Sequence, residues 1–530
     1  ESDGFRDNND IDTNIYTAYA QYELSPRASA QVELRRQDTE AGDLREFSNP
    51  AFVFENLRQS LDRDTARFGF RFSPDPNSDV LASLAYRELV RDTNDPNFTP
   101  TADFLLDFFR PSPPAALNPE DIAFLNSLAP LFPAGFNELI RTTNDVNSAT
   151  FELEYLRSWE RLNIALGGGF TQQERARTVF NNLTLSSPLA ANLREELQQA
   201  GLPASLADPL IKGIDKFATS DLAGEDSDET HLNAYLYGTV RLLHNLHLTT
   251  GVAVNAIDRD SEQTATLDRK GTYVSPKVGA MWEPFASTRF RAGWFRAVAR
   301  PSASNQTIEP THVAGFNQVF DDAGGARFQR YGVAVDQKLP LHVDGGFEFT
   351  WRDVELPRFE FGGNPRASLI SQEETAHRAY LYWTPTQRVT LAAQYFYEEL
   401  ERGPLTSLEN GTPRSALLHR VPLSLGYYDP NGFFTRLTAT YVNQDVDVRD
   451  DNVPLGTSEA SDRFWSTDVV LGYRLPKRLG IVTFGVINLF DEGLRFQDAS
   501  PNVIGDIEGE FVPPEFLPER VLFGQVTLAF

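Results

Sequence analysis

The stretch LHVDGGFEFTWR, residues 341–352, decides the fold that this sequence predicts. Its odd-numbered positions are apolar residues or glycine, and its even-numbered positions are mostly polar or charged. An α-helix would spread these charges round its whole circumference, whereas a β-strand sends successive side chains to opposite faces. The stretch therefore predicts a strand with one apolar face and one polar face.

The same two-faced pattern recurs along the chain. Clear examples are residues 67–72, 151–155, 247–254, 388–397 and 434–442. About 19 such segments can be counted, and each is near the length that a tilted strand needs to cross an outer membrane. The series predicts an all-β protein, a transmembrane antiparallel β-barrel of about 20 strands (range 18–22).

The links between these segments alternate in length. Short links that contain turn residues occur at 25–27, 73–79, 283–287, 384–387, 429–432 and 475–480. Between them lie long polar connections at 38–64, 92–148, 173–229, 300–325 and 493–518. Outer-membrane barrels have short turns on the periplasmic side and long loops outside the cell, so this alternation favours a barrel over a soluble sandwich or propeller.

The composition excludes several classes of protein. The chain has 530 residues, a formal net charge of −26 and no cysteine, which excludes disulfides and cysteine-based metal or catalytic sites. No stretch approaches the roughly 20 continuous apolar residues of a membrane helix. The acidic excess argues against nucleic acid as a partner, because phosphate binding requires clustered Lys and Arg.

Two of the long connections contain helix signals. Asn118 followed by Pro119 begins one predicted helix, and Ser187-Pro188 begins another that ends at Gly201. Long, partly helical extracellular loops are therefore expected. They would either form a lid over the pore or simply fold to stay compact, and the sequence leaves both readings open.

The last ten residues, VLFGQVTLAF, read as the closing strand of the barrel. One face carries Leu522, Val526, Leu528 and Phe530, the pattern of a C-terminal signal for the barrel assembly machinery. If this strand ends in the periplasm, counting back places residues 1–14 outside the cell. Because bacterial barrels generally have an even number of strands, an upstream strand or a periplasmic domain before residue 1 is expected, unless the count is wrong by one.

Two blocks resemble a known family. FGVINLFDEGLRFQD (484–498) with PERVLFGQVTLAF (518–530) is similar to the closing strands of TonB-dependent receptor barrels, and residues 273–302 are similar to the central hairpin of that family. TIEPTHVAGFNQVFDD (307–322) resembles barrel regions fused behind periplasmic tetratricopeptide repeats. The resemblance implies a barrel that moves solutes across the outer membrane.

The chain departs from that family in one respect. Receptors of this family carry an N-terminal plug and a segment that contacts TonB, yet strand-like alternation begins here near Ile15. The sequence therefore leaves open whether the chain takes up solutes with energy supplied through TonB. Because an unfilled barrel of about 20 strands would be a wide hole, a plug, a partner or folded loops are expected to occupy the lumen.

The polar faces of the strands supply the candidate functional residues. Charged side chains on the lipid side would each cost roughly 2–4 kcal/mol near the midplane, so they are expected to point into the lumen. There they would select solutes or grip a plug, or they would simply form the charged wall of any water-filled barrel. The lumen-lining candidates are Arg67, Arg71, Glu152, Glu154, Arg289, Arg291, His342, Asp344, Glu348 and Arg352.

No catalytic pattern is found in the sequence. The seven histidines do not form a zinc motif, and neither a nucleophile elbow nor a phosphate-binding loop occurs, so the chain is not expected to be an enzyme and no cofactor or metal site is predicted. The acidic segments 221–230 and 445–452 would either bind divalent cations or form a solvated surface. Tyr and Trp near strand ends, at 159, 282, 382, 383 and 465, suit the aromatic girdles of a barrel.

These observations predict a channel or transporter in the outer membrane of a Gram-negative bacterium. The expected partners are outer-membrane lipid and lipopolysaccharide, the barrel assembly machinery, and a plug or periplasmic partner domain. The alternative is a membrane anchor and exit port for a periplasmic repeat domain or a bound partner, in polymer or protein export or in surface assembly. The sequence does not indicate which solute passes.

Overall fold

The protein is described by a computed structural model over residues 8–44, 56–99, 136–185, 221–261, 269–300, 307–318, 322, 324–360, 366–403, 413–449, 457–496, 516 and 519–528. The two predicted helices in the segments after Asn118 and Ser187 lie outside these residues, as does Phe530. Among the described residues, no helix combines the length and the apolar character needed to cross a membrane.

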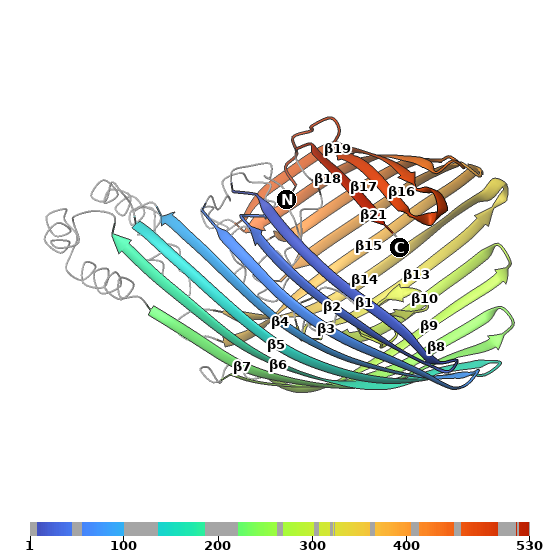
Figure 1. Cartoon of the computed structure of the whole chain (residues 1–530), viewed down its shortest axis with the longest axis horizontal. Helices are drawn as coiled ribbons and strands as arrows, with labels where there is room; N and C mark the ends of the chain where they lie inside the picture. The colour runs from blue at the N-terminus through green and yellow to red at the C-terminus, as the bar shows by residue number, and fades with distance from the viewer. Residues whose placement is uncertain are drawn as a thin grey trace, which may run out of the picture.

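In the described residues the main sheet has 19 strands, and each of them pairs antiparallel with the next strand of that sheet along the chain (Figure 1). Its strands are β1 (Ile11–Ser25), β2 (Ala28–Ala41), β3 (Arg58–Asp75), β4 (Ser78–Thr99), β5 (Phe136–Ser158), β6 (Leu162–Leu185), β7 (Asp221–Leu243), β8 (Leu246–Ser261), β9 (Arg269–Phe285), β10 (Thr288–Val298), β13 (Arg327–Leu339), β14 (Val343–Glu360), β15 (Arg366–Thr386), β16 (Val389–Arg402), β17 (Pro413–Tyr428), β18 (Phe433–Arg449), β19 (Thr457–Arg474), β20 (Gly480–Ile487) and β21 (Val521–Leu528). The predicted all-β antiparallel architecture is confirmed.

The sheet curves round an interior, as Figure 1 shows. Within the described residues no hydrogen-bonded pairing joins β1 to β21. Because each link reverses the chain and the sheet has 19 strands, β1 and β21 run in the same direction.

Every second link is short, as the sequence predicts. Tight turns join β1 to β2 at residues 26–27, β3 to β4 at 76–77 and β9 to β10 at 286–287. Two further turns contain short 3-10 helices, η5 (Pro340–His342) and η7 (Pro476–Arg478). The turn at η5 places Leu341 and His342 at positive φ, so β14 begins at Val343 and not at Leu341 as predicted.

On the opposite side of the barrel the strands are longer than predicted. Residues 221–230 belong to β7 and residues 445–449 to β18, although the sequence reads both as loop. The apolar and polar alternation that marks a strand depends on lipid on one face. Where a paired strand continues beyond the membrane, both faces meet water and the alternation disappears.

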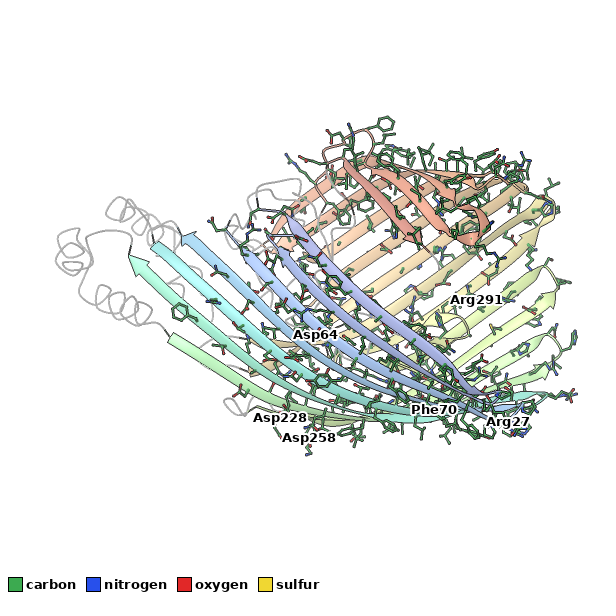
Figure 2. All side chains as sticks on the ribbon, in the orientation of Figure 1. Arg27, Asp64, Phe70, Asp228, Asp258 and Arg291 are labelled. Carbon is green, nitrogen blue, oxygen red and sulfur yellow. The ribbon has the colours of Figure 1, made fainter. Side chains whose placement is uncertain are left out.

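The two faces of the sheet have opposite character, and their exposure is the reverse of that in a soluble protein. On β14, Phe347 is 55% exposed and Trp351 is 42% exposed. Thr350 and Arg352, which point to the other face of the same strand, are 3% and 7% exposed. Side chains project from both faces of the curved wall in Figure 2. The exposed apolar face suits lipid, and the polar face forms the inner wall.

Aromatic rings form a row on the outer face of β14 to β17. Trp351 contacts His377, His377 stacks on Tyr397, and Tyr397 contacts His419, each with ring centroids 5.4 Å apart. From Val343 to Trp351 the strand rises ~26 Å at about 3.3 Å per residue, or ~20 Å of height at the usual tilt. That height is close to the apolar band of about 25 Å between the two aromatic girdles of a barrel.

Tyr382 is predicted to belong to an aromatic girdle, but its side chain points to the inner face of the sheet. Its hydroxyl receives a hydrogen bond of 2.9 Å from Arg378 and donates one of 3.0 Å to Gln394, both on the inner face. Its neighbour Trp383 is exposed on the outer face. Adjacent strand residues point to opposite faces, so Tyr382 and Trp383 cannot share one girdle.

The last strand, β21, turns its apolar side chains outward. Leu522 and Val526 are each 63% exposed and Leu528 is 52% exposed. This is the face that the sequence assigns to lipid.

Candidate functional site on the inner wall

A small hairpin, residues 307–318, lies against the inner face of the sheet. Its strands are β11 (His312–Val313) and β12 (Phe316–Asn317), joined by Ala314 and Gly315 at φ values of 49° and 86°. Two positive φ values in a two-residue link are typical of a type I′ turn. A Cβ on Gly315 would also lie 2.9 Å from Nη1 of Arg291, so glycine is favoured here for two reasons.

Phe316, the first residue of β12, packs its ring against two glycines of the sheet. Its ring is only 1% exposed and packs with Val313, Phe295 and Phe328 in one apolar cluster. A Cβ on Gly293 of β10 would lie 3.0 Å from the ring, and one on Gly332 of β13 would lie 2.5 Å from it. The bare backbone at these inward positions therefore makes room for the hairpin.

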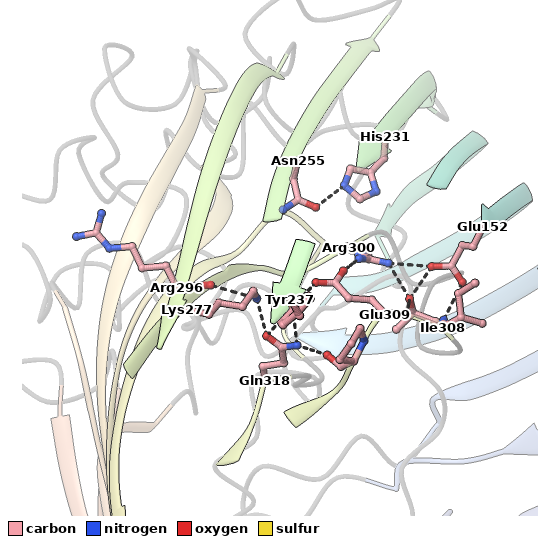
Figure 3. Close-up of polar contacts among 12 residues, drawn as sticks. Glu152, His231, Tyr237, Asn255, Lys277, Arg296, Arg300, Ile308, Glu309 and Gln318 are labelled. Atoms are coloured by element: carbon pink, nitrogen blue, oxygen red, sulfur yellow. Dashed lines mark hydrogen bonds and ion pairs between the residues drawn. The ribbon is translucent and has the colours of Figure 1, made fainter. Parts of the chain in front are cut away.

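A carboxylate of the barrel wall anchors the start of the hairpin (Figure 3). Glu152 of β5 accepts hydrogen bonds from Nη1 of Arg300 at 3.1 Å, from the hydroxyl of Thr307 at 2.5 Å and from the backbone N–H of Ile308 at 3.0 Å. Arg300 also forms an ion pair with Glu309 of the hairpin. One buried wall residue thus fixes three groups of the segment that follows β10.

A second set of contacts joins both ends of the hairpin to the wall. Tyr237 of β7 donates a hydrogen bond of 2.6 Å to Glu309 and accepts one of 2.9 Å from Gln318. Lys277 of β9 donates hydrogen bonds to Gln318 and, at 3.5 Å, to the carbonyl oxygen of Arg296. With Arg330 of β13, which donates to the Asn317 carbonyl at 3.1 Å, the hairpin is held on polar side chains from four strands.

Arg300 is almost completely enclosed by this arrangement. Burial lowers the pKa of its guanidinium, and the negative charge of Glu152 partly offsets that shift. An arginine stays protonated even so, because its ordinary pKa is far above neutral pH. The cluster therefore keeps a buried positive charge between a carboxylate of the wall and one of the hairpin.

Beside this anchor lie polar atoms that the anchor does not use. Oε1 of Glu154, the hydroxyl of Tyr235 and Nδ2 of Asn233 are buried, and they have no hydrogen-bond partner within the described part of the chain. Glu154 and Tyr235 are each paired in register with Gly167 of β6, from opposite sides. Because Gly167 has no side chain, β6 places nothing between the carboxylate and the tyrosine.

A ladder of ion pairs continues along the inner wall. Nε of Arg291, labelled in Figure 2, donates to Asp336 at 2.9 Å, and its Nη2 donates to Glu348 at 3.1 Å. Arg352 of β14 bridges Asp322 at 2.8 Å and Glu374 at 2.6 Å. These charges are compensated in pairs, which is how buried charges persist in a protein wall.

The residues that the sequence proposes for the lumen fall into three groups. Glu152, Glu154, Arg291, Glu348 and Arg352 lie on the inner face, in or next to the two clusters described above. Arg71 pairs with Asp79 and Arg289 with Glu283 near the short turns, Arg67 is half-buried on β3, and Asp344 is exposed near the start of β14. His342 lies in the turn at η5, outside the strand to which the sequence assigns it.

Sequence reasoning missed Lys277, Arg300, Tyr237 and the hairpin itself. The segment 300–325 reads as one polar connection, and nothing in its alternation indicates that it folds back on the wall. A usable signal is glycine at inward strand positions, since Gly279, Gly293 and Gly332 would each bring a Cβ against the hairpin. In the ranges that the structure describes, no group of three or more His, Asp or Glu residues is arranged to hold a metal ion.

A family model described as "TonB dependent receptor-like, beta-barrel" matches residues 2–332. The chain belongs to this TonB-dependent receptor-like β-barrel family. Barrels of this family lie in the outer membrane of Gram-negative bacteria, which places the chain there. The family consists of receptors and transporters, so the chain is not an enzyme.

Solved structures of the family share the fold. The ferripyoverdine receptor of the outer membrane of Pseudomonas aeruginosa aligns with a TM-score of 0.60 and 11% identity, over 93% of this chain and 62% of the receptor. FpvAI in complex with pyocin S2 aligns with a TM-score of 0.60 and 12% identity, over 93% of this chain and 64% of that protein. The unliganded ferric citrate transporter FecA gives a TM-score of 0.61 and 13% identity, over 99% of this chain and 71% of FecA.

This TonB-dependent receptor-like barrel spans less than two thirds of the first two proteins. At these identities the likeness concerns the fold alone. A comparison with curated protein sequences found no match.

Proposed function

We propose that the barrel is a solute conduit across the outer membrane, and that the hairpin 307–318 narrows its lumen. The observation that carries this proposal is the attachment of the hairpin to the inner wall through Glu152, Tyr237 and Lys277. Hydrogen bonds and ion pairs of this kind are reversible. The hairpin can therefore detach from the inner wall. The polar inner wall and the membership of a receptor and transporter family support a role in transport.

The lumen residues have separate tasks in this proposal. Glu152 holds the hairpin, while Arg291, Glu348 and Arg352 form the charged wall along which a solute passes. Arg71, Arg289 and Asp344 line the lumen near the short turns, and Arg67 lines it near the middle of β3. The alternative of an anchor and exit port gains no support from the similar proteins, which are a receptor for ferripyoverdine and transporters for copper and ferric citrate.

The partners of the chain follow from its surfaces. The apolar outer face, with its aromatic row, would contact lipid and the acyl chains of lipopolysaccharide. The outward residues Leu522, Val526 and Leu528 of β21 would serve recognition by the barrel assembly machinery. A plug or periplasmic partner domain would fill the part of the lumen that the hairpin leaves open.

A pair of glycine substitutions tests whether the hairpin restricts passage. Gly332→Val places a side chain where Phe316 lies, whereas at Gly238, on the outer face of β7, the one contact of a new Cβ with the described residues is Leu162 at 4.0 Å. In liposome-swelling assays with neutral sugars of increasing size, Gly332→Val should admit sugars faster and with a larger size limit. Gly238→Val should behave like the unmodified protein. Equal swelling of all three, with both variants folded, would contradict the proposal.

A further inference from the structure

Glu152 and Glu154 place two buried carboxylates side by side on the inner face of β5. They are 2% and 3% exposed, and as alternate residues of one strand they point the same way. Glu152 is fully engaged by the hairpin segment, whereas Oε1 of Glu154 has no partner among the described residues. Two carboxylates thus share this part of the wall, and one of them still lacks a donor.

The strand next to these carboxylates, β6, has glycine at the two facing positions, and the side chains of Tyr235 and Asn233 lie over these glycines. Across β6, Glu154 faces Gly167 and then Tyr235, while Glu152 faces Gly169 and then Asn233. The hydroxyl of Tyr235 lies directly over Gly167, and it is also buried without a partner in the described structure. A carboxylate oxygen and a phenol oxygen, both free to accept, therefore border the same glycine-lined patch.

A guanidinium already binds one of the two carboxylates. Arg300 donates to Glu152 at 3.1 Å, and its side chain is 12% exposed. Guanidinium and ammonium groups are the donors that best match carboxylate pairs, and a bidentate guanidinium matches them most closely. Arg300 thus shows which chemistry the wall accepts.

We propose that Glu152, Glu154 and Tyr235 form a binding site for solutes that carry a guanidinium or primary ammonium group, and that Arg300 occupies half of it as an internal substitute. The proposal rests on the proposed conduit, because the solute reaches the site through the lumen. A solute cation binds Glu154 and the Tyr235 hydroxyl first, and then competes with Arg300 for Glu152.

Displacement at Glu152 has a direct effect on the hairpin. The hydroxyl of Thr307 and the N–H of Ile308 both donate to this carboxylate, so they lose their acceptor when a solute takes it. The hairpin then loses one of its polar anchors, keeps those to Tyr237, Lys277 and Arg330 and the packing of Phe316, and detaches from the wall more readily. Binding of a cationic solute and widening of the lumen are therefore coupled at one residue.

An anionic solute fits this patch less well. It would face Glu152 and Glu154 of the wall and Glu309 of the hairpin. The nearby cations are already engaged, Arg300 by carboxylates and Lys277 by Gln318 and the Arg296 carbonyl. Buried like charges repel strongly, so the site discriminates in favour of cations.

Because the chain has no cysteine, a single introduced cysteine can be labelled specifically. Thr311→Cys, at an exposed position of the hairpin, can carry a single environment-sensitive fluorophore on the folded protein in lipid vesicles. Methylguanidinium is the probe, and N-methylurea is its uncharged isostere. We expect a saturable fluorescence change with methylguanidinium and none with N-methylurea at equal concentrations.

Two isosteric variants test the residues of the site. Glu154→Gln, which leaves the anchor at Glu152 intact, should raise the half-saturating concentration of methylguanidinium at least tenfold. Tyr235→Phe should raise it less, in a protein that keeps its fold because only one hydroxyl is removed. An unchanged midpoint in both variants, an equal response to N-methylurea, or a saturable response to acetate in place of methylguanidinium would each overturn the proposal.

Failure of this inference is distinguishable from failure of the proposed conduit. If Gly332→Val leaves sugar swelling unchanged while methylguanidinium still binds saturably through Glu154, the conduit is contradicted and the cation site stands. If swelling responds but methylguanidinium does not bind, the conduit stands and the cation site is overturned.

Discussion

Asp429 is a residue whose protonation affects a turn of this barrel. It lies between β17 and β18, where its carboxylate accepts hydrogen bonds from the backbone N–H of Asn431 at 2.9 Å and from the Tyr427 hydroxyl at 3.1 Å. These two bonds lower the pKa of Asp429 below its ordinary value of 3.8. The folded protein therefore binds this proton less readily than the unfolded chain does.

The expected pH dependence follows from that sign. Because the folded pKa is depressed, the contribution of Asp429 to stability is complete above its ordinary pKa and is lost as the pH falls through the folded value. Asp429→Asn should lower the thermal midpoint at pH 7, and the midpoints of the two proteins should converge as the pH falls below the folded pKa of Asp429. Melting curves in detergent across this range measure it. A difference that stays constant down to the lowest pH would contradict the assigned hydrogen bonds.

At the scale of single residues, the sequence predicts which face of the sheet a side chain points to. It predicts less well which groups that side chain binds. Alternation is enough to send Glu152, Arg291 and Arg352 to the inner face, because a strand has only two faces. It cannot show that Glu152 anchors Thr307 and Ile308, which lie more than 150 positions along the chain. Those contacts depend on the curvature of the sheet and on bare glycine positions.

At the scale of elements, the hairpin 307–318 depends on its turn. Gly315→Ala should destabilise the hairpin by about 1–3 kcal/mol, because alanine disfavours a φ of 86° and its Cβ would meet Arg291. Hydrogen exchange of the Gln318 amide, which bonds to the Thr311 carbonyl at 3.0 Å, should then become at least about tenfold faster.

Gly493→Ala is the matched control for this change. Among the described residues other than its chain neighbours, no atom lies within 4 Å of a Cβ built on Gly493, and its φ is not positive. Exchange at Gln318 should be unchanged in that variant. Equal exchange rates in both variants would show that the turn does not limit the stability of the hairpin.

The strands themselves were predictable as elements, whereas their lengths and the hairpin were not. Lipid on one face forces the alternation seen in β14, so existence and pairing order can be read from the sequence. Above the membrane that constraint ends, which is why the first ten residues of β7 read as loop. The hairpin carries no such pattern because it packs on a protein wall and not on lipid.

At the scale of the whole molecule, the exposed apolar face of the sheet is the face expected to contact lipid. Phe347→Arg, near the middle of the outer face of β14, should therefore destabilise the barrel by about 2–4 kcal/mol in lipid vesicles. Asp344→Arg places the same charge on the other face of the same strand and should change the unfolding free energy much less. Urea unfolding in vesicles measures both, and equal effects would contradict the assignment of the two faces.

The strand number also belongs to this scale. The part of the chain that the structure describes forms a sheet of 19 strands, within the predicted range of 18–22, and the first and last of these run in the same direction. The sequence could indicate the range because each crossing has a recognisable pattern. That a further strand or periplasmic domain precedes residue 1 stays a prediction, and so does the occupant of the remaining lumen.

The most direct test of the central claim is single-channel conductance in planar bilayers. The unmodified protein is compared with a variant in which residues 307–318 are replaced by a Gly-Ser segment of equal length. If the hairpin narrows a conduit, the variant should conduct several-fold better than the unmodified protein at the same salt concentration. The same conductance in both proteins would contradict the claim that this hairpin restricts the lumen.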